Sequence, residues 1–333
     1  EEMHALYLIL DWAEANDVDV FLQQMWSNQA WNSYRHVQPL ISAPVSLDDF
    51  TRGIVQLMKQ LTEERAYTCI KWLCLSNEPP GPGWGCWWSM GDEVPESSAA
   101  YEAQMAALNY EPQGTPAPFT PVLKSVREAL DTAEIAIPLS GPDWTGVQML
   151  NPEWVDFDSY IGAYDLHSYM GLDGQNKEIF KSWADWARER NKPLFISEIG
   201  NMKLGWKGSD PGPRSMEAAL SNAHDIMQGL EIGASAFNRW SFTNRGNLDG
   251  QWQLIRTWDI SKKKYRVHVS PEPVAYYGYG IISRFLIKHS TVLTTEKQDG
   301  HSIMSQTLKS PDGRITTYLV NLGDQKQEVV LTY

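Results

Sequence analysis

Two glutamates, Glu78 and Glu198, stand at the ends of apolar, strand-like runs of this sequence. Glu78 follows the run at 69–77 and precedes two prolines, and Glu198 lies near the end of the run at 193–200. A pair of carboxyl groups can divide acid, base and nucleophile chemistry between them, because one group can hold a proton while the other is charged. The sequence therefore predicts a two-carboxylate site, provided that the fold brings these two strand ends together.

Cleavage of an acetal suits such a pair. The reaction requires a proton at the leaving oxygen and a nucleophile at the anomeric carbon, and two carboxyl groups supply both. A charged Glu198 would keep the proton on Glu78 during the first step, and Glu78 could then act as a base toward water once Glu198 is glycosylated. Carboxyl groups about 5.5 Å apart would imply retention of configuration through a covalent intermediate.

Strand-like and helical runs alternate along most of the chain. The predicted strands are 18–26, 69–77, 135–141, 161–169, 193–200 and 234–242. The predicted helices are 3–15, 47–64 after a Ser46 cap, 120–132, 177–190 and 215–230, with Gly233 as a stop signal. Alternation of this kind is typical of a parallel sheet wrapped by crossover helices, and no Gly-rich phosphate loop supports an open doubly wound sheet. We expect an α/β fold, a (β/α)8 TIM barrel that is N-terminally incomplete because six strands fall short of eight.

The end of the chain has a different pattern. The barrel is expected to span residues 1–289, and a C-terminal β region to span 290–333. The second region carries four short β-type runs between Gly-containing turn signals: 290–297, 302–308, 314–322 and 327–333. This predicts a small, sandwich-like β appendage, and whether it is cut short stays open.

Other polar residues close the predicted strands, where barrels collect their functional side chains. His167 and Tyr169 are two residues apart and share one strand face, and Trp240 lies in the last strand. Alone, His167 would be a hydrogen-bonded structural histidine and Tyr169 a wall residue, but their place among the strand ends favours a site. Asp165 is expected to be a hydrogen-bond support and Asp143 a loop cap.

Several strings resemble those of the clan A glycoside hydrolases. The Asn-Glu-Pro string at 77–79 is similar to the motif on the fourth barrel strand of that clan, and the Ser-Glu pair at 197–198 is similar to the motif on the seventh. The segment 25–31 resembles the third-strand loop of family 30, with Gln29 where that family usually has Pro, and 275–285 resembles its last barrel helix. The Asp-x-His-x-Tyr and Phe-Ile-Ser-Glu-Ile-Gly strings are equally similar to family 5, so the two families stay open.

The resemblance implies a role for each of these residues. Glu78 would be the acid/base and Glu198 the nucleophile. Asn77 would bind the sugar 2-hydroxyl beside the nucleophile, and His167 and Tyr169 would orient the two carboxyl groups. The likeness covers most of the expected barrel, but the Arg that the clan usually carries on an early strand is not in view.

Tryptophan is unusually frequent, with 15 residues beside 14 Tyr, and flat amphipathic rings often line ligand grooves. By the resemblance, Trp240 would form the floor under the sugar at the cleavage point. The Gly/Trp loop at 81–88 is either a platform for substrate or a lid packed on its own rings, and we expect the platform. The further expected sugar contacts are Trp26, Trp31, Trp84 and Trp88, of which Trp26 and Trp31 could equally belong to the core. Trp183 and Trp186, on a crossover helix, are expected in the core.

Composition excludes several classes of partner. The 41 acidic and 28 basic side chains give a net charge of -13, which opposes binding to nucleic acid. No apolar run approaches the roughly 18 residues of a membrane span. The three cysteines show no metal-ligand spacing, so neither a metal nor a cofactor is expected, and Cys69 and Cys74 look like buried thiols. No signal peptide is visible, a secreted or periplasmic location is slightly favoured, and the oligomeric state stays open.

We therefore expect a retaining β-glycoside hydrolase that acts on a polysaccharide, oligosaccharide or glycoconjugate. Two alternatives remain: a non-catalytic carbohydrate-binding barrel, suggested by the abundance of Trp, and a transglycosylase that uses the same glutamate pair with a sugar acceptor. The sugar, the linkage and the choice between endo and exo attack are not predicted.

Overall fold

The computed structural model describes residues 2–24, 32–34, 42–81, 87–89, 115–201, 215–243, 253–259, 262, 264–294 and 302–332. The chain forms two compact units. The first comprises residues 1–166 and 190–193, and the second comprises 167–189 and 194–333.

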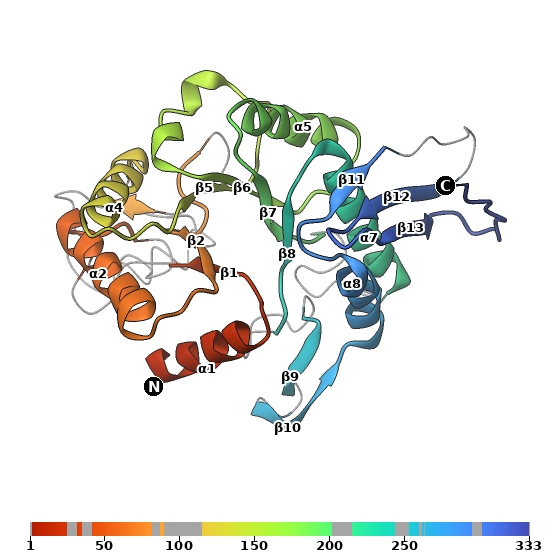
Figure 1. Ribbon diagram of the computed structural model, residues 1–333, viewed down its shortest axis with the longest axis horizontal. Coiled ribbons are helices and arrows are strands. Elements are labelled where there is room, and N and C mark those ends of the chain that lie inside the picture. Colours follow the sequence, from red (N-terminus) through yellow and green to blue (C-terminus); the bar gives the residue numbers. More distant parts are fainter. Residues whose placement is uncertain are drawn as a thin grey trace. The chain divides into compact units, whose positions relative to one another are not determined.

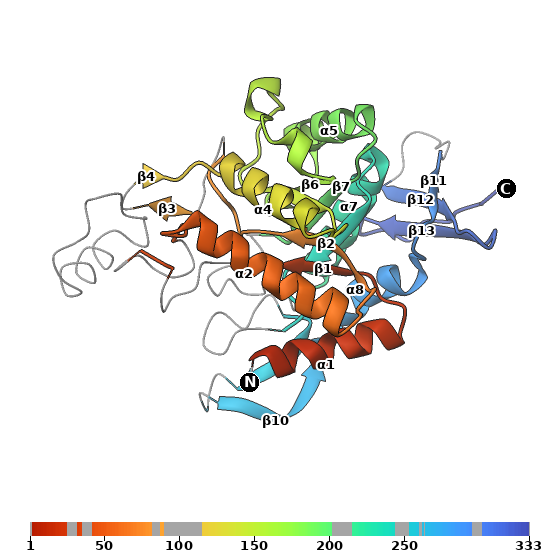
Figure 2. The ribbon, with the colours of Figure 1, turned by 60° about the vertical axis from the view of Figure 1, so that its left-hand side comes forward.

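The first unit is built on parallel strands in chain order. These strands are β1 (Val20–Gln23), β2 (Ile70–Cys74), β5 (Leu139–Trp144) and β6 (Ala163–Ser168), the last of which ends in the second unit. Every residue of β5 and β6 is buried, as expected for a parallel sheet that is covered on both faces. The helices are α1 (Glu2–Ala15), α2 (Leu47–Lys59) and α4 (Thr120–Thr132), of which α2 and α4 lie side by side (Figures 1 and 2).

The second unit repeats the pattern. Strands β7 (Leu194–Ile199) and β8 (Ala236–Arg239) pair in parallel. Its helices are α5 (Gly174–Glu189), α7 (Met216–Ile232) and α8 (Pro273–Phe285). Ser215 caps the start of α7, and Gly233 ends the helix in the left-handed conformation that glycine adopts without a steric penalty, which confirms the predicted stop.

Within the described residues, six parallel strands alternate with helices, which confirms the predicted architecture, an incomplete (β/α)8 barrel of the α/β class. The bounds of several elements differ from the prediction, most clearly in two places. Strand β5 runs from 139 to 144 and not from 135 to 141, and the helix expected over 47–64 is α-helical only to Lys59 and continues as a π-helix (Gln60–Glu64). None of the helices in the described part of the chain is long and apolar enough to cross a membrane.

Antiparallel strands end the chain, as expected. Strands β11 (Thr291–Leu293), β12 (Ile303–Lys309) and β13 (Ile315–Asn321) form one sheet, and β12 and β13 contact α7 (Figure 1). The hydroxyl of Tyr318 donates to the carbonyl of Ile282 in α8 at 2.9 Å, which ties the sheet to that helix. The fourth β-type run takes no strand in residues 327–332. The boundary between 289 and 290 stays a prediction.

Two short pairings were not predicted. A hairpin of β9 (Ile255–Asp259) and β10 (Lys264–Pro271) lies between β8 and α8 in the sequence. Strands β3 (Trp88–Ser89) and β4 (Thr115–Pro116) form a two-residue antiparallel pair.

The indole of Trp183 in α5 is fully buried, as predicted, whereas Trp186 is half-buried. We expect Trp183→Ala to lower the free energy of unfolding by about 3 to 5 kcal/mol, because it removes a large apolar side chain and leaves a cavity. Trp12→Ala in α1 is the matched control, since that ring is 61% exposed and its loss should change stability by about 0.5 kcal/mol or less. Chemical denaturation of the two variants measures the difference, and equal losses would contradict the assignment of Trp183 to the core.

Candidate active site

Glu78 lies four residues beyond β2 in the first unit, where it is half-buried. Its backbone has a φ of +50°, in the left-handed region that residues other than glycine rarely adopt. Its backbone N–H donates to Oδ2 of Asp143 at 3.1 Å. The end of β5 therefore holds the backbone from which the Glu78 carboxyl group projects.

Asp143 was expected to be a loop cap; its carboxylate does accept the N–H of Glu78 in the loop after β2, but Asp143 itself lies in a strand and not in a loop. It is fully buried within β5, because this strand continues through Pro142 to Trp144. Its backbone N–H donates to Oδ1 of Asp165 in β6 at 2.6 Å. The prediction that Asp165 is a hydrogen-bond support is therefore confirmed.

Gln23, the last residue of β1, is a polar contact that the sequence reasoning missed. Its Nε2 group donates to Oδ2 of Asp143 at 3.0 Å and to the carbonyl of Ser76 at 2.8 Å. The signal was present, because Gln23 is a polar residue at the end of an apolar run, the same feature that drew attention to Glu78 and Glu198.

Asn77 directly precedes Glu78 and is half-buried. Its Oδ1 atom is buried and has no hydrogen-bond partner among the described residues. A buried amide oxygen of this kind is stabilised when it accepts a hydrogen bond. A hydroxyl group of a bound ligand could supply one.

Glu198 lies near the end of β7 in the second unit and is 8% exposed. The Tyr169 hydroxyl donates a hydrogen bond to Oε2 of Glu198, and Nδ1 of His167 lies 3.3 Å from the same oxygen. His167 is buried in β6, and Tyr169 follows the end of that strand. The rings of His167 and Tyr169 meet edge to face, with centroids 6.3 Å apart.

These two contacts orient the carboxyl group of Glu198. Both reach the same oxygen, so they fix the rotation of the carboxylate and with it the direction of Oε1. Hydrogen bonds to a carboxylate favour its charged form. The arrangement suits a nucleophile or an electrostatic partner for developing positive charge.

Trp240 directly follows β8 and is half-buried. Its backbone N–H donates to the carbonyl of Ile199 at 3.1 Å, which places it beside the end of β7. The neighbouring Arg239 donates to the carbonyl of Trp240 at 2.7 Å, and burial lowers the pKa of Arg239 to about 10. The guanidinium therefore remains charged at neutral pH.

The predicted site residues are distributed over both units. Asn77 and Glu78 are neighbours in the first unit, and the second unit brings His167 and Tyr169 to Glu198. Trp88 begins β3. Three predicted sugar contacts lie outside the described residues: Trp26, Trp31 and Trp84.

One cluster in the first unit has the composition of a metal site. Ligand atoms of Cys74, Asp143 and Asp165, all buried, lie within 4.8 Å of one another. Burial, followed by the charges of the two aspartates, raises the pKa of the Cys74 thiol well above its usual range. The thiol donates weakly to the carbonyl of Ser76. Both Cys69 and Cys74 are free, buried thiols, as predicted.

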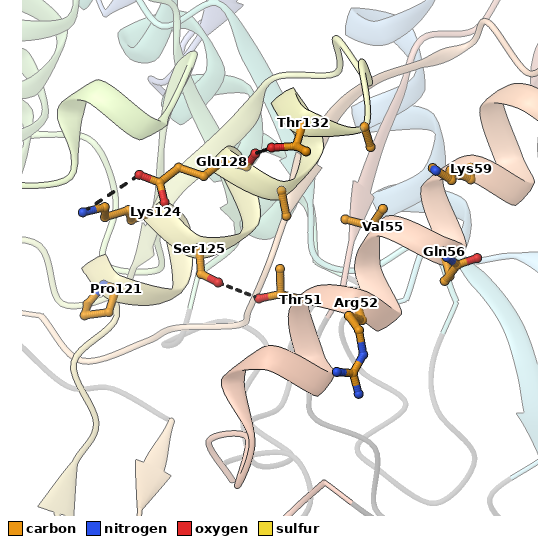
Figure 3. A pocket seen from close by; sticks show the side chains of 12 residues that line it. Thr51, Arg52, Val55, Gln56, Lys59, Pro121, Lys124, Ser125, Glu128 and Thr132 are labelled. Atoms are coloured by element: carbon orange, nitrogen blue, oxygen red, sulfur yellow. Dashed lines mark hydrogen bonds and ion pairs between the residues drawn. The ribbon is translucent and has the colours of Figure 1, made fainter.

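Two surface cavities contain polar side chains, one in each unit. A groove of about 670 Å³ lies between α2 and α4, where Thr51 and Ser125 share a hydrogen bond of 2.9 Å (Figure 3). None of the predicted site residues lines this groove. A cavity of about 400 Å³ in the second unit includes Tyr169, His224 and Asp225, and the hydrogen bond that His224 makes to the carboxylate of Asp225 raises the pKa of His224.

No family model and no curated protein matches this chain. Solved structures do match it. An endoxylanase of glycoside hydrolase family 30 from Clostridium papyrosolvens matches with 12% identity and a TM-score of 0.56, over 94% of this chain and 67% of that protein. The endo-β-1,6-glucanase BT3312 matches with 15% identity and a TM-score of 0.58, over 92% and 66%. The protein SrfJ from Salmonella typhimurium matches with 14% identity and a TM-score of 0.57, over 92% and 62%.

The chain thus spans about two thirds of the length of these proteins, or slightly less. At 12 to 15% identity the likeness shows the fold. This protein therefore has part of the (β/α)8 barrel fold of the clan A glycoside hydrolases, several of which are among its solved structural neighbours.

Proposed function

We propose that this protein is a retaining β-glycoside hydrolase in which Glu198 is the nucleophile and Glu78 the acid/base. The observation that carries the proposal is the setting of Glu198, a nearly buried carboxylate at a strand end whose Oε2 is bound by Tyr169 and His167. A nucleophilic carboxylate must be held in one orientation toward the anomeric carbon, and two contacts to one oxygen do this.

The first unit supplies the proposed acid/base residue and a proposed sugar contact. Glu78 projects from a backbone that is held by Asp143, and Asn77 beside it has a buried Oδ1 atom suited to accept a sugar hydroxyl. The proposal requires the carboxyl groups of Glu78 and Glu198 to lie about 5.5 Å apart when substrate is bound. Trp240, with Trp26, Trp31, Trp84 and Trp88, is proposed to contact the sugar rings.

The proposed reaction has two steps. In the first, Glu198 attacks the anomeric carbon and forms an ester bond, the glycosidic C–O bond breaks, and the proton of Glu78 passes to the departing oxygen. In the second, Glu78 takes a proton from water, the water oxygen attacks the same carbon, and Glu198 is released as a carboxylate. Two inversions leave the configuration retained.

The proposed substrate is a β-linked polysaccharide, oligosaccharide or glycoconjugate. The solved neighbours include xylanases and a β-1,6-glucanase, so β-xylan, β-1,6-glucan and their oligomers form the first panel to be tried. We further propose that residues 1–289 carry the catalytic barrel and that residues 290–333 form an appended β region.

Covalent trapping tests the proposal on the full chain. A 2-fluoro β-glycoside with a dinitrophenyl leaving group slows the second step, so the glycosyl ester should accumulate and appear as one added sugar on the peptide that contains Glu198. Glu198→Gln should take up no label, and turnover of the panel should begin with a β-configured product. Tight binding of a glycan without label or turnover would favour a non-catalytic barrel, and products extended by a sugar acceptor would favour a transglycosylase.

A further inference from the structure

The backbone at Glu78 has a conformation that its own sequence does not favour. Its φ of +50° is left-handed, and a glutamate has no short side chain that could stabilise this conformation through a local hydrogen bond. The two following residues are prolines, which carry no backbone N–H, so the N–H of Glu78 is the only amide donor in residues 78–80. Contacts from elsewhere in the first unit must therefore hold this turn.

The end of strand β5 provides these contacts at two points. Oδ2 of Asp143 accepts the N–H of Glu78 at 3.1 Å. The next residue, Trp144, donates from Nε1 to the carbonyl of Pro80 at 3.1 Å. Its ring also lies against Gly81 so closely that a Cβ at this position would come within 2.7 Å of ring atoms. Two consecutive residues of β5 thus bind the start and the end of the segment 78–81.

Asp143 is itself held by residues of two other strands, β1 and β6. Gln23 at the end of β1 donates to the same Oδ2 atom at 3.0 Å, and Asp165 of β6 accepts the backbone N–H of Asp143 at 2.6 Å. Asp143 and Asp165 are fully buried. A fully buried carboxylate oxygen that accepts two N–H donors has little freedom to move. It therefore provides a fixed reference point for the Glu78 backbone.

We propose that Asp143 is a positioning residue for Glu78: through the Glu78 amide it sets the direction in which the acid/base carboxyl group meets the leaving oxygen. This inference rests on the proposed function. Asp143 acts through the backbone of Glu78 and takes no part in bond making. Its loss should weaken the proton transfer and leave the nucleophilic attack by Glu198 in place.

The kinetic test compares two leaving groups. Asp143→Ala should lower kcat/KM about 100-fold on a β-glycoside with a poor leaving group, because a displaced general acid loses most of its contribution. On a dinitrophenyl glycoside, which needs no proton, the loss should be about fivefold or less. Asp143→Asn retains an oxygen that can accept the Glu78 N–H, so it should recover most of the lost activity.

Asp158→Ala is the matched control in the same unit. Asp158 accepts hydrogen bonds from the Tyr164 hydroxyl and from Lys192, and it lies in the turn before β6. This variant should lower the melting temperature without any dependence on the leaving group. An Asp143→Ala variant that folds and loses activity equally on both leaving groups, or loses none, overturns the proposal.

A second measurement, hydrogen exchange at the Glu78 amide, does not require that the protein turn over a substrate. Because Pro79 and Pro80 have no amide hydrogen, hydrogen exchange in residues 78–80 reports the Glu78 N–H alone. This exchange should be at least about tenfold faster in Asp143→Ala than in the wild type, and unchanged in Asp158→Ala. Unchanged exchange in Asp143→Ala overturns the positioning contact even if the protein hydrolyses no glycoside. Inactivity of the wild type across the panel, by contrast, counts against the proposed function only.

If Asp143→Ala does not fold, Trp144→Phe carries the test. It removes the indole N–H that binds the Pro80 carbonyl and keeps an aromatic ring beside Gly81. We expect a loss of about tenfold on the poor leaving group, the size expected for one buried hydrogen bond, and little change on the dinitrophenyl glycoside. A loss of kcat/KM of the same size on both substrates, relative to the wild type, overturns the proposal here as well.

Discussion

Glu198→Ala is expected to lower kcat on an aryl β-glycoside by about 10⁵-fold, because it removes the group that forms the covalent intermediate. The side chain is nearly buried, and the shorter alanine leaves a space beside Tyr169 and His167 into which a small anion fits. Azide should therefore restore turnover, and its product should be the α-glycosyl azide, since a single displacement on a β-glycoside inverts the anomeric carbon.

Product configuration is the decisive measurement for this variant. The control is Glu231→Ala, which removes a half-exposed glutamate paired with Lys177 at the end of α7 and should leave kcat within about twofold of the wild type. Undiminished hydrolysis by Glu198→Ala, or a β-configured azide product, would count against Glu198 as the nucleophile.

The barrel elements could be predicted because each obeys one local rule. Parallel strands that are buried on both faces are rich in apolar residues, as in the first half of β7, and the ends of α7 are marked by the cap residue Ser215 and by Gly233. Strand β5 was placed about three residues too early, because Gly141 and Pro142 normally interrupt a strand. The hairpin of β9 and β10 was missed although Tyr265, Val267 and Val269 of β10 alternate with polar residues, because the sequence between the two strands carries no Gly-containing turn signal.

Parts of the candidate site could also be predicted from a local sequence pattern. Polar residues that close apolar runs pointed to Glu78, His167, Tyr169 and Glu198, and within the second unit three of these contact one another. The proposed role of Asp143 could not be predicted from the sequence, because it depends on a left-handed backbone at Glu78 and on a hydrogen bond between residues 65 positions apart. Neither feature has a local sequence signal.

The loss of kcat/KM caused by Glu78→Ala is expected to depend on the leaving group of the substrate. On a β-glycoside whose leaving group needs a proton, kcat/KM should fall about 10³-fold, within the range that a general acid contributes. On a dinitrophenyl glycoside the first step should proceed almost normally, but hydrolysis of the glycosyl ester should slow because no base activates water. The ester should then accumulate and kcat and KM should fall together.

The configuration of the azide product distinguishes Glu78→Ala from Glu198→Ala. It needs no general base, so it should attack the accumulated ester of Glu78→Ala and give the β-glycosyl azide, the product of two inversions. Glu78→Gln is the matched variant: it keeps nearly the same volume and the same N–H contact to Asp143 but cannot donate a carboxylic proton, and it should show the same dependence on the leaving group. If Glu78→Ala lost activity equally on every leaving group and gave no azide product, Glu78 would be a structural residue. If it gave the α-glycosyl azide instead, the roles of the two glutamates would have to be exchanged.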